Sequence, residues 1–365
     1  MSTNFFLKSI AFNNYRAFKD LQIESFKRIN IIGGQNGTGK TTLLEALFFI
    51  LDYRNLHAIT RPYGWRRTHF GPDLINQLFY QQGKSVPLSI AAETTMGTFK
   101  TTIEHSYPPI GTSIEIPLNT IQPRFDTEQQ PTNNQQPNRD MGLTISVEVN
   151  RKPVSAIFIL GIQNGISVTP YLTAPTVPPP PGVMINAASR NSPQEDSERY
   201  SNIVKNNKED QLLKIVSLVR SDITKIKLLS ENGVNIFYAN TSSNQILPLP
   251  MLGDGVQTVL SIGLAIMNSK NGMLFLDEFE STVHYSNLAN IWKCIGEMAE
   301  EYNCQIFAAT HSLECVRFAT EGLSSTERTK DLQYIRLENR KGTIKAEIYD
   351  ANELNNALSG QWEIR

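Results

Sequence analysis

The chain has 365 residues, of which 40% are hydrophobic and 19% are charged, and its formal net charge at pH 7 is −1. This composition is typical of a soluble globular protein, and the length fits two average domains or one large α/β domain with insertions. The near-zero charge excludes a strong global field for nucleic acid or membranes. We find no signal peptide, and the longest apolar runs are too short to span a membrane. Cys294, Cys304 and Cys315 lack disulfide or metal spacing, so a cytoplasmic protein with reduced thiols is expected.

Residues 1–120 are predicted to hold strands, a glycine-rich loop and a helix. The apolar run RINII precedes the loop GGQNGTGKTT, LLEALFFIL follows it, and SVPLSIAAETT and GTFKTTIEHS have strand-like patterns. Residues 121–208 are predicted to be a loop-rich insertion, in which the polar segment 126–140 forms a mobile loop. Five prolines between Pro175 and Pro181 are typical of a linker or strap, although a proline-motif docking site is an alternative.

The region 209–365 returns to regular periodicity. A helical stripe is predicted after Glu209, and another helix is predicted over residues 287–301. MLFLD and QIFAAT are expected to be buried strands, and DLQYIRLE and TIKAEIYD are expected to pair as a hairpin across NRKG. This alternation of strands and helices predicts the α/β fold class. The apolar positions of the first stripe are Leu212, Ile215, Val216, Val219, Ile223 and Ile226.

The loop at residues 33–42 contains a phosphate-binding motif. Gly34, Gly39, Lys40 and Thr41 satisfy the pattern GxxxxGK[ST]. Glycines let backbone N–H groups converge on phosphates, and the following helix offers its positive N-terminus. The lysine supplies a cation, and the threonine hydroxyl can bind Mg²⁺. The motif therefore predicts a bound nucleotide with Mg²⁺, and the alternative is a merely structural glycine turn.

Two carboxylates end the apolar strand MLFLD. Asp277 and Glu278 lie side by side, which is costly at the end of a buried strand unless a cation or a water network uses them. The alternative is a pair of solvated acids that cap the strand. His311 follows the second buried strand, and a histidine in this place is either structural or a contact to the nucleotide.

The order of these motifs resembles that of ABC-type ATPases. Gly37 and Thr42 extend the loop to GxxGxGKTT, and the LDE sequence and a histidine follow in the family's order. The resemblance implies that the nucleotide is ATP, that Asp277 holds Mg²⁺ through water and that Glu278 polarises the attacking water. It also implies that His311 lies near the γ-phosphate. The expected residues are Lys40, Glu278 and His311 for catalysis, Thr41 and Asp277 for the metal, and Gly34, Gln35, Asn36, Gly37, Thr38, Gly39, Lys40, Thr41 and Thr42 for the nucleotide.

A second glycine-containing segment, LPLPMLGDGVQTVLSI, takes the place of the family's signature motif. By resemblance, Gly253, Asp254 and Gly255 bind the γ-phosphate of a nucleotide held by a partner subunit. This implies a homodimer or higher homo-oligomer with composite ATP sites, in which Glu280, Ser281 and His284 lie in the D-loop at the interface. A helix is expected to begin near Val256, and its N-terminal amides would favour an anion. The motif departs from the family pattern, because Gly253 replaces a serine and Asp254 replaces a glycine, so an ordinary glycine-rich helix start is the alternative.

The start of the chain, LGDG, LDEFESTVH and AATHSLECV together resemble the ATPase domain of OLD-family proteins and stand-alone ATPase subunits of prokaryotic anti-phage defence systems. The resemblance implies an ABC-type P-loop NTPase fold with an antiparallel β part and a core sheet flanked by helices. Residues 1–120 and 209–365 would then be the two halves of the ATPase domain, separated by the proline-rich insertion. The resemblance also places Tyr15 and Arg16 near the nucleotide, with Arg16 close to phosphate, although both could equally be surface residues.

The function implied by this resemblance is a sensor or regulatory ATPase that controls a separate effector protein such as a nuclease. The 54 residues after His311 are too few for the Toprim nuclease domain of OLD proteins. Two alternatives remain open: a slow- or non-hydrolysing ATP-gated scaffold, favoured by the altered signature, and a DNA-repair ATPase of RecF type. A basic and aromatic cluster could contact nucleic acid, but such clusters are more often solvated faces or protein contacts. Its members are Arg61, Trp65, Arg66, Arg67 and His69.

Overall fold

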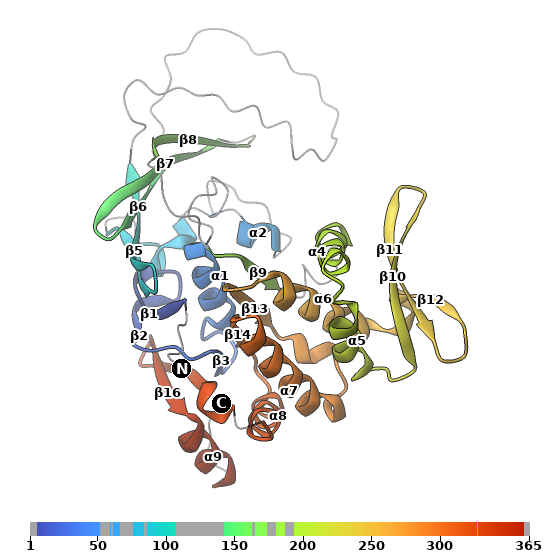
Figure 1. The fold of residues 1–365 in the computed structure, drawn as a ribbon. Coiled ribbons are helices and arrows are strands. Elements are labelled where there is room, and N and C mark those ends of the chain that lie inside the picture. Colours follow the sequence, from blue (N-terminus) through green and yellow to red (C-terminus); the bar gives the residue numbers. More distant parts are fainter. Residues whose placement is uncertain are drawn as a thin grey trace.

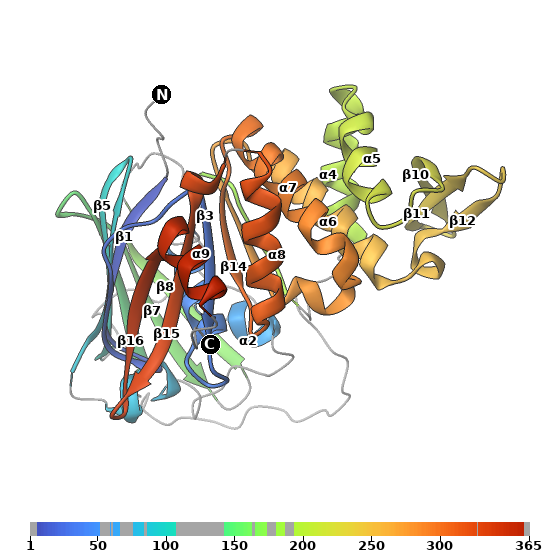
Figure 2. The same ribbon diagram turned by 90° about the horizontal axis from the view of Figure 1, so that it is seen from below.

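A core sheet lies between an antiparallel sheet and a layer of helices in the computed structural model (Figures 1 and 2). The structure describes residues 6–51, 59, 61–65, 76–83, 86–106, 142–162, 165–173, 180–186, 193–326 and 328–360. The predicted mobile loop at 126–140 and most of the proline run lie outside these residues. Among the described helices, none is long and apolar enough to cross a membrane. All three cysteines are buried and free of disulfides.

The core sheet has six strands in the order β16-β15-β3-β14-β13-β9. Its strands run parallel except for β16, which returns antiparallel to β15. The register places Asp277 beside Ala309 and Ala309 beside Ile32, so β13, β14 and β3 end at the same edge. The predicted strands MLFLD and QIFAAT and the predicted hairpin are confirmed. The bounds are β3 (Ile29–Gly34), β9 (Gly182–Ile185), β13 (Met273–Asp277), β14 (Gln305–Ala309), β15 (Leu332–Arg340) and β16 (Thr343–Asp350).

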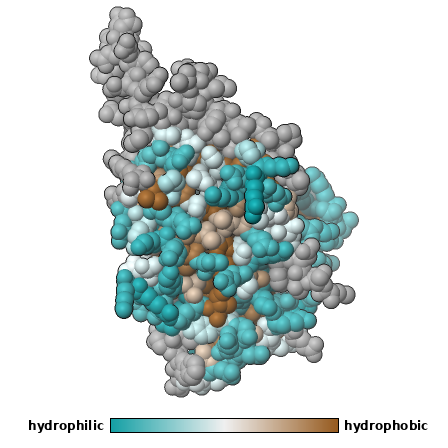
Figure 3. Space-filling view, turned by 90° about the vertical axis from the view of Figure 1, so that its left-hand side faces the viewer, coloured by the Kyte–Doolittle hydropathy of each residue, from teal (hydrophilic) through white to brown (hydrophobic). Residues whose placement is uncertain are grey.

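One face of the core sheet packs against α1 (Lys40–Leu51) and a seven-stranded antiparallel sheet. Alternate residues of the core strands, such as Ile32 and Phe275, join Leu47 of α1 and Phe12 of β1 in one buried cluster. The outer side of the antiparallel sheet is mainly hydrophilic, with apolar residues gathered along its middle (Figure 3). Its order is β2-β1-β4-β5-β6-β7-β8. The bounds are β1 (Leu7–Tyr15), β2 (Phe18–Ile23), β4 (Leu88–Thr94), β5 (Gly97–Ser106), β6 (Gly142–Val149), β7 (Lys152–Ile162) and β8 (Gly165–Thr173).

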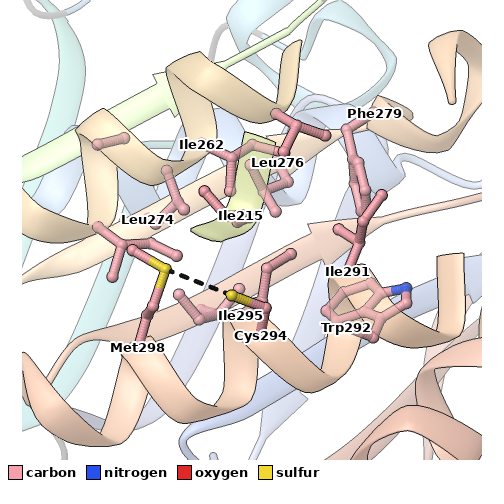
Figure 4. Packing of buried hydrophobic residues seen from close by; sticks show 14 of the residues in the cluster. Ile215, Ile262, Leu274, Leu276, Phe279, Ile291, Trp292, Cys294, Ile295 and Met298 are labelled. Carbon is pink, nitrogen blue, oxygen red and sulfur yellow. Dashed lines mark hydrogen bonds between the residues drawn. The ribbon is translucent and has the colours of Figure 1, made fainter. Parts of the chain in front are cut away.

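Helices cover the other face of the core sheet. Leu274 and Leu276 of β13 pack against Ile262 of α6 and against Ile291 and Ile295 of α7 (Figure 4). The predicted helix over 287–301 is therefore confirmed as part of α7. Beyond α5 and α6, a small sheet of β10, β11 and β12 projects from the molecule (Figures 1 and 2). The bounds are α4 (Pro193–Lys205), α5 (Glu209–Ser217), β10 (Ile223–Glu231), β11 (Val234–Thr241), β12 (Ile246–Pro248), α6 (Asp254–Asn268), α7 (Tyr285–Glu301), α8 (Leu313–Ser324) and α9 (Ala351–Ser359).

The predicted helical stripe after Glu209 is wrong beyond Ser217. Helix α5 ends there, and Ile223 and Ile226 lie in strand β10. Both isoleucines are buried at a spacing of three residues because the strand register shifts between Ile223 and Lys225, and their β-branched side chains favour a strand. The pair Asn232–Gly233, with φ of 51° and 80°, makes the tight turn that pairs β10 with β11. An Asn-Gly pair is a strong signal for a hairpin, so the sequence itself indicated this turn.

The predicted insertion over 121–208 contains more regular structure than expected. Strands β6, β7 and β8 extend the antiparallel sheet, β9 forms an edge of the core sheet, and α4 packs against α6. The segment LTISVEVN forms most of β6. Pairing with β5, from Phe99 to Ser106, supplies the hydrogen bonds that fix it as a strand.

Candidate active site

The loop between β3 and α1 has three glycines with a backbone conformation that favours glycine, and two of them, Gly34 and Gly39, also have close contacts. Gly34 has φ of +136° and Gly39 has φ of +90°. A Cβ at Gly34 would lie 2.3 Å from the carbonyl oxygen of Leu337, and a Cβ at Gly39 would lie 2.9 Å from the ring of Phe18. The motif glycines are therefore fixed by the path of the loop and by its close contacts.

Lys40 is the first residue of α1, and its ammonium group folds back onto the loop. Its Nζ donates hydrogen bonds to the carbonyl oxygens of Gly34 (2.9 Å) and Gln35 (3.1 Å). Burial lowers the pKa of Lys40, while the nearby carboxylates of Glu278 and Asp277 act in the opposite direction. The loop thus holds a cation at the positive end of a helix, which is the combination that favours a bound anion.

Thr41 and Asp277 meet beside this lysine. Thr41 Oγ1 donates to the carboxylate of Asp277, at 3.0 Å from Oδ2 and 3.3 Å from Oδ1. Oxygen ligands suit Mg²⁺, which usually takes one or two protein carboxylates together with phosphate oxygens and water. In the described part of the chain, no three His, Cys, Asp or Glu side chains group as a metal site. The two side chains therefore fit a sparsely held Mg²⁺ ion rather than an all-protein metal cage.

Glu278 and His311 lie at the ends of β13 and β14. His311 Nδ1 is 3.0 Å from Glu278 Oε1, and the two side chains are 52% and 44% exposed, respectively. Glu278 has a left-handed backbone (φ 50°, ψ 40°), and its N–H donates to the carbonyl oxygen of Ala309 at 3.0 Å. A carboxylate and an imidazole therefore face solvent together at the edge that carries the phosphate-binding loop.

The turn after Glu278 contains an inward-facing acid. Glu280 lies in η4 (Phe279–Thr282), is buried, and accepts a hydrogen bond from Thr310 Oγ1. The expected D-loop position of Glu280, Ser281 and His284 does not predict this burial, and Thr310 is not among the expected site residues. One signal was present: Thr310 follows the wholly buried strand QIFAA, where a buried hydroxyl needs a hydrogen-bond partner.

The signature-like segment forms the start of α6. The helix begins at Asp254 rather than near Val256, and Asp254 is exposed. Gly255 is buried, and a Cβ there would lie 2.7 Å from the carbonyl oxygen of Thr282. Helix α6 packs on the face of the core sheet opposite α1. The structure therefore brings Gly253–Gly255 to the D-loop turn and not into the cluster around Lys40.

Arg16 contacts the side of α1. Its Nη1 lies 2.5 Å from Glu45 Oε2, and its guanidinium carbon lies 5.6 Å and 5.4 Å from the ring centroids of Tyr15 and Tyr63. The Glu45 side chain is only 2% exposed. Glu45 is the single charged residue in the run LLEALFFIL. A lone charge in such a run indicates a buried ion pair, so the sequence already held a signal for this contact. The expected contact between Arg16 and phosphate stays a prediction.

The predicted basic cluster lies mostly outside the described residues. Arg61 belongs to α2 (Arg61–Trp65), and its guanidinium carbon lies 5.8 Å from the ring centroid of Phe48. The side chains at positions 65, 66, 67 and 69 lie outside the described part of the chain. A nucleic-acid contact by this cluster therefore stays a prediction.

Comparison with known proteins shows the family. The family model described as an AAA domain matches residues 9–246, so the chain belongs to this family. Over 358 residues the chain is 22% identical to an ATP/GTP phosphatase of Helicobacter pylori, covering 90% of each protein. Over 55 residues, which are 15% of each protein, it is 40% identical to the DNA replication and repair protein RecF of Rickettsia prowazekii.

Solved structures of SMC head domains share the fold. One is an SmcHead bound to the C-winged helix domain of ScpA, with a TM-score of 0.53 and 13% identity, covering 97% of this chain and 99% of that one. Another is an Smc head domain with an extended coiled coil, bound to the C-terminal domain of ScpA derived from Pyrococcus furiosus. It has a TM-score of 0.52 and 10% identity, and the match covers 98% of this chain and 99% of that one. The chain therefore belongs to the AAA-domain family and shares the fold of SMC head domains.

Proposed function

We propose that this chain is a Mg²⁺-dependent ATPase that converts ATP and water to ADP and phosphate. The observation that carries the proposal is the meeting at one sheet edge of the Lys40 cation, the Thr41–Asp277 pair and the Glu278–His311 pair. Similarity to a protein named ATP/GTP phosphatase supports nucleotide hydrolysis. Phosphate release that requires Mg²⁺ and is lost in Lys40→Ala is the expected result, and release that continues in that variant would contradict it.

In this proposal, each group of the site has its own task. Lys40 and the loop amides would bind the phosphates, and Thr41 and Asp277 would hold Mg²⁺. When bound, the metal ion neutralises charge on the phosphate oxygens. Glu278 orients the attacking water and accepts its proton on the carboxylate. His311 holds Glu278 Oε1 through Nδ1, which keeps the carboxylate at the edge of the sheet.

The active unit in this proposal is a homodimer or higher homo-oligomer. The start of α6 in one subunit, Gly253–Gly255, contacts the nucleotide held by the loop of another. In support, two large apolar side chains beside these elements are exposed: Met251 by 77% and Tyr285 by 60%. Met251 precedes α6 and Tyr285 begins α7 after the D-loop turn, so both can add apolar contact area to such an interface.

Light scattering tests the oligomer directly. Glu278→Gln with ATP and Mg²⁺ should bind nucleotide without hydrolysing it and therefore accumulate as a dimer or larger species. Lys40→Ala is the matched control, because it should remain at the mass of the nucleotide-free protein. A Glu278→Gln mass that does not change at saturating ATP would contradict composite sites.

The biological role in this proposal is control of a separate effector protein, such as a nuclease, during phage infection. It rests on the motifs that resemble OLD-family and anti-phage ATPases, among them LDEFESTVH and AATHSLECV. Expressing the chain with its neighbouring genes should reduce phage plaque counts, and Glu278→Gln should abolish this protection. Equal plaque counts with and without the wild-type genes would contradict the role.

Two other functions have support from particular observations. The departures at Gly253 and Asp254 favour an ATP-gated scaffold with slow or no turnover. The 55-residue match to RecF favours a DNA-repair ATPase. DNA binding that survives charge reversal at Arg66 and Arg67 would argue against the basic cluster as the DNA site.

A further inference from the structure

Glu280 is a buried carboxyl group two residues after Glu278. It is 9% exposed, although it lies in a short turn at the edge of the sheet. Its Oε1 accepts a hydrogen bond from Thr310 Oγ1, and its Oε2 is buried without a hydrogen-bond partner among the described residues. Burial raises the pKa of Glu280, although the hydrogen bond from Thr310 acts in the opposite direction. An apolar side chain would fill such a place at lower cost, so the carboxyl group calls for a functional reason.

Thr310 fixes the backbone on both sides of His311. Its N–H donates to the carbonyl oxygen of Ile32 at 3.0 Å, which ties it to the strand before the phosphate-binding loop. Its Oγ1 donates to Glu280 and also accepts a hydrogen bond from the N–H of Ser312 at 2.9 Å. One hydroxyl therefore connects the segment that carries His311 to the turn that follows Glu278.

The turn that follows Glu278 is also held in place by several contacts. Phe279 is buried and packs edge-on against Trp292, with ring centroids 5.4 Å apart (Figure 4). Ser281 Oγ donates to the carbonyl oxygen of Glu278 at 2.8 Å. The backbone of Glu278 is left-handed, a conformation that residues other than glycine disfavour. The surrounding structure must therefore hold it in place, and these contacts do so. Within this turn, Glu280 is the residue whose side chain contacts Thr310, directly after β14.

We propose that Glu280 and Thr310 are a positioning pair that keeps Glu278 and His311 in hydrogen-bond contact during hydrolysis. Neither residue touches the nucleotide in this scheme; both act through the two side chains that do. The inference rests on the proposed ATPase function and names residues that the motif pattern alone does not assign.

Substitution of Thr310 is the sharpest test. Thr310→Val keeps the shape of the side chain and removes the hydroxyl, and it should lower kcat on the order of ten- to a hundredfold, as expected for a misplaced catalytic group. The KM for ATP and the affinity for a fluorescent ATP analogue should stay within about twofold, because the phosphate-binding loop is untouched. Thr310→Ser restores the hydroxyl and should recover most of kcat.

A matched control separates this role from general destabilisation. Thr320 is another buried threonine, on α8, whose Oγ1 donates to the carbonyl oxygen of Val316 at 2.8 Å. Thr320→Val should leave kcat unchanged at a temperature where circular dichroism shows all variants folded. Glu280→Gln can still accept the hydrogen bond from Thr310 and should retain at least about half of kcat, whereas Glu280→Leu should resemble Thr310→Val.

The possible results distinguish this inference from the function beneath it. A wild-type chain without turnover would overturn the ATPase proposal and this role together. Wild-type turnover with an equal kcat in folded Thr310→Val would overturn the positioning role alone. Loss of nucleotide affinity in Thr310→Val at unchanged kcat would also overturn it. Because the pair acts as a unit, Glu280→Leu combined with Thr310→Val should lower kcat no further than Thr310→Val.

Discussion

Thr41 Oγ1 lies 3.0 Å from Asp277 Oδ2, although the two residues are 236 positions apart in the sequence. Thr41 is in the first turn of α1 and Asp277 is the last residue of β13, with β14 between β13 and β3 in the sheet. The parallel arrangement brings the ends of these strands to one edge. The core sheet thus brings the proposed metal-binding pair together from two distant segments.

The Thr41–Asp277 pair should control the dependence of nucleotide binding on Mg²⁺. Asp277→Asn should weaken Mg²⁺-dependent ATP binding by about 10- to 100-fold. The substitution replaces one of the two carboxylate oxygens that are proposed to hold the ion by an amide group. Binding measured in EDTA should change little. Titrating ATP with and without Mg²⁺ by calorimetry checks both values.

Thr41 offers the matched comparison for that titration. Thr41→Ser keeps the hydroxyl and should bind Mg²⁺ and ATP much as the wild type does, whereas Thr41→Val removes the oxygen and should resemble Asp277→Asn. Equal Mg²⁺ dependence in the serine and valine variants would contradict a ligand role for this hydroxyl.

The Arg16–Glu45 ion pair should contribute strongly to stability, because it is nearly buried, with side chains 12% and 2% exposed. Replacing Glu45 by Leu leaves a buried guanidinium without its carboxylate and should lower the free energy of unfolding by about 3–5 kcal/mol. The double variant Arg16→Met, Glu45→Leu should recover much of this loss. Urea unfolding followed by circular dichroism gives the comparison.

An exposed ion pair in the same chain provides the control. Lys345 Nζ lies 2.9 Å from Asp20 Oδ1, with side chains 45% and 61% exposed. Lys345→Ala should change the free energy of unfolding by about 0–1 kcal/mol. If Glu45→Leu lowers the free energy of unfolding no more than Lys345→Ala does, the Arg16–Glu45 pair does not contribute strongly to stability.

Gly253 allows the missing hydroxyl of the signature to be tested. Its backbone (φ 101°, ψ 155°) is one that residues other than glycine disfavour, so Gly253→Ser and Gly253→Ala should each lower the free energy of unfolding by about 1–3 kcal/mol. A Cβ at this position would meet nothing within 4 Å, so backbone strain is the expected cost. Since both variants carry the same strain, their difference in turnover isolates the hydroxyl. We expect faster turnover in the serine variant, and equal rates would show that the hydroxyl does not reach the nucleotide.

The sequence predicted the local parts of this molecule well. The phosphate-binding loop, the strand MLFLD with its two carboxylates and the β15–β16 hairpin depend on patterns within a few residues, and the structure confirms their secondary structure. The helical stripe failed at Ile223 because the strand register shifts between Ile223 and Lys225, which allows Ile223 and Ile226 to be buried together at a helix-like spacing. The strands β6 to β8 form because they pair with neighbouring strands, and the sequence of one segment does not show which segments will pair with it.

The partners of buried charges were the least predictable feature. Glu45 and Glu280 are buried acidic residues that need partners, and the sequence does not show which residues these are. Arg16 lies 29 positions from Glu45, and Thr310 lies 30 positions from Glu280. Such contacts depend on how β1 meets α1 and how η4 meets the end of β14, and these are properties of the fold rather than of any motif.

The most direct test of the account is ATP turnover by the purified chain, measured beside Glu278→Gln with nucleotide binding recorded for both. The account predicts Mg²⁺-dependent phosphate release by the wild type and a loss of about 10²–10⁴-fold in the variant, with ATP affinity retained. That result would establish a self-sufficient ATPase in which Glu278 acts on the attacking water. Equal and negligible rates in both proteins, with ATP still bound, would contradict the catalytic assignment and favour an ATP-held scaffold.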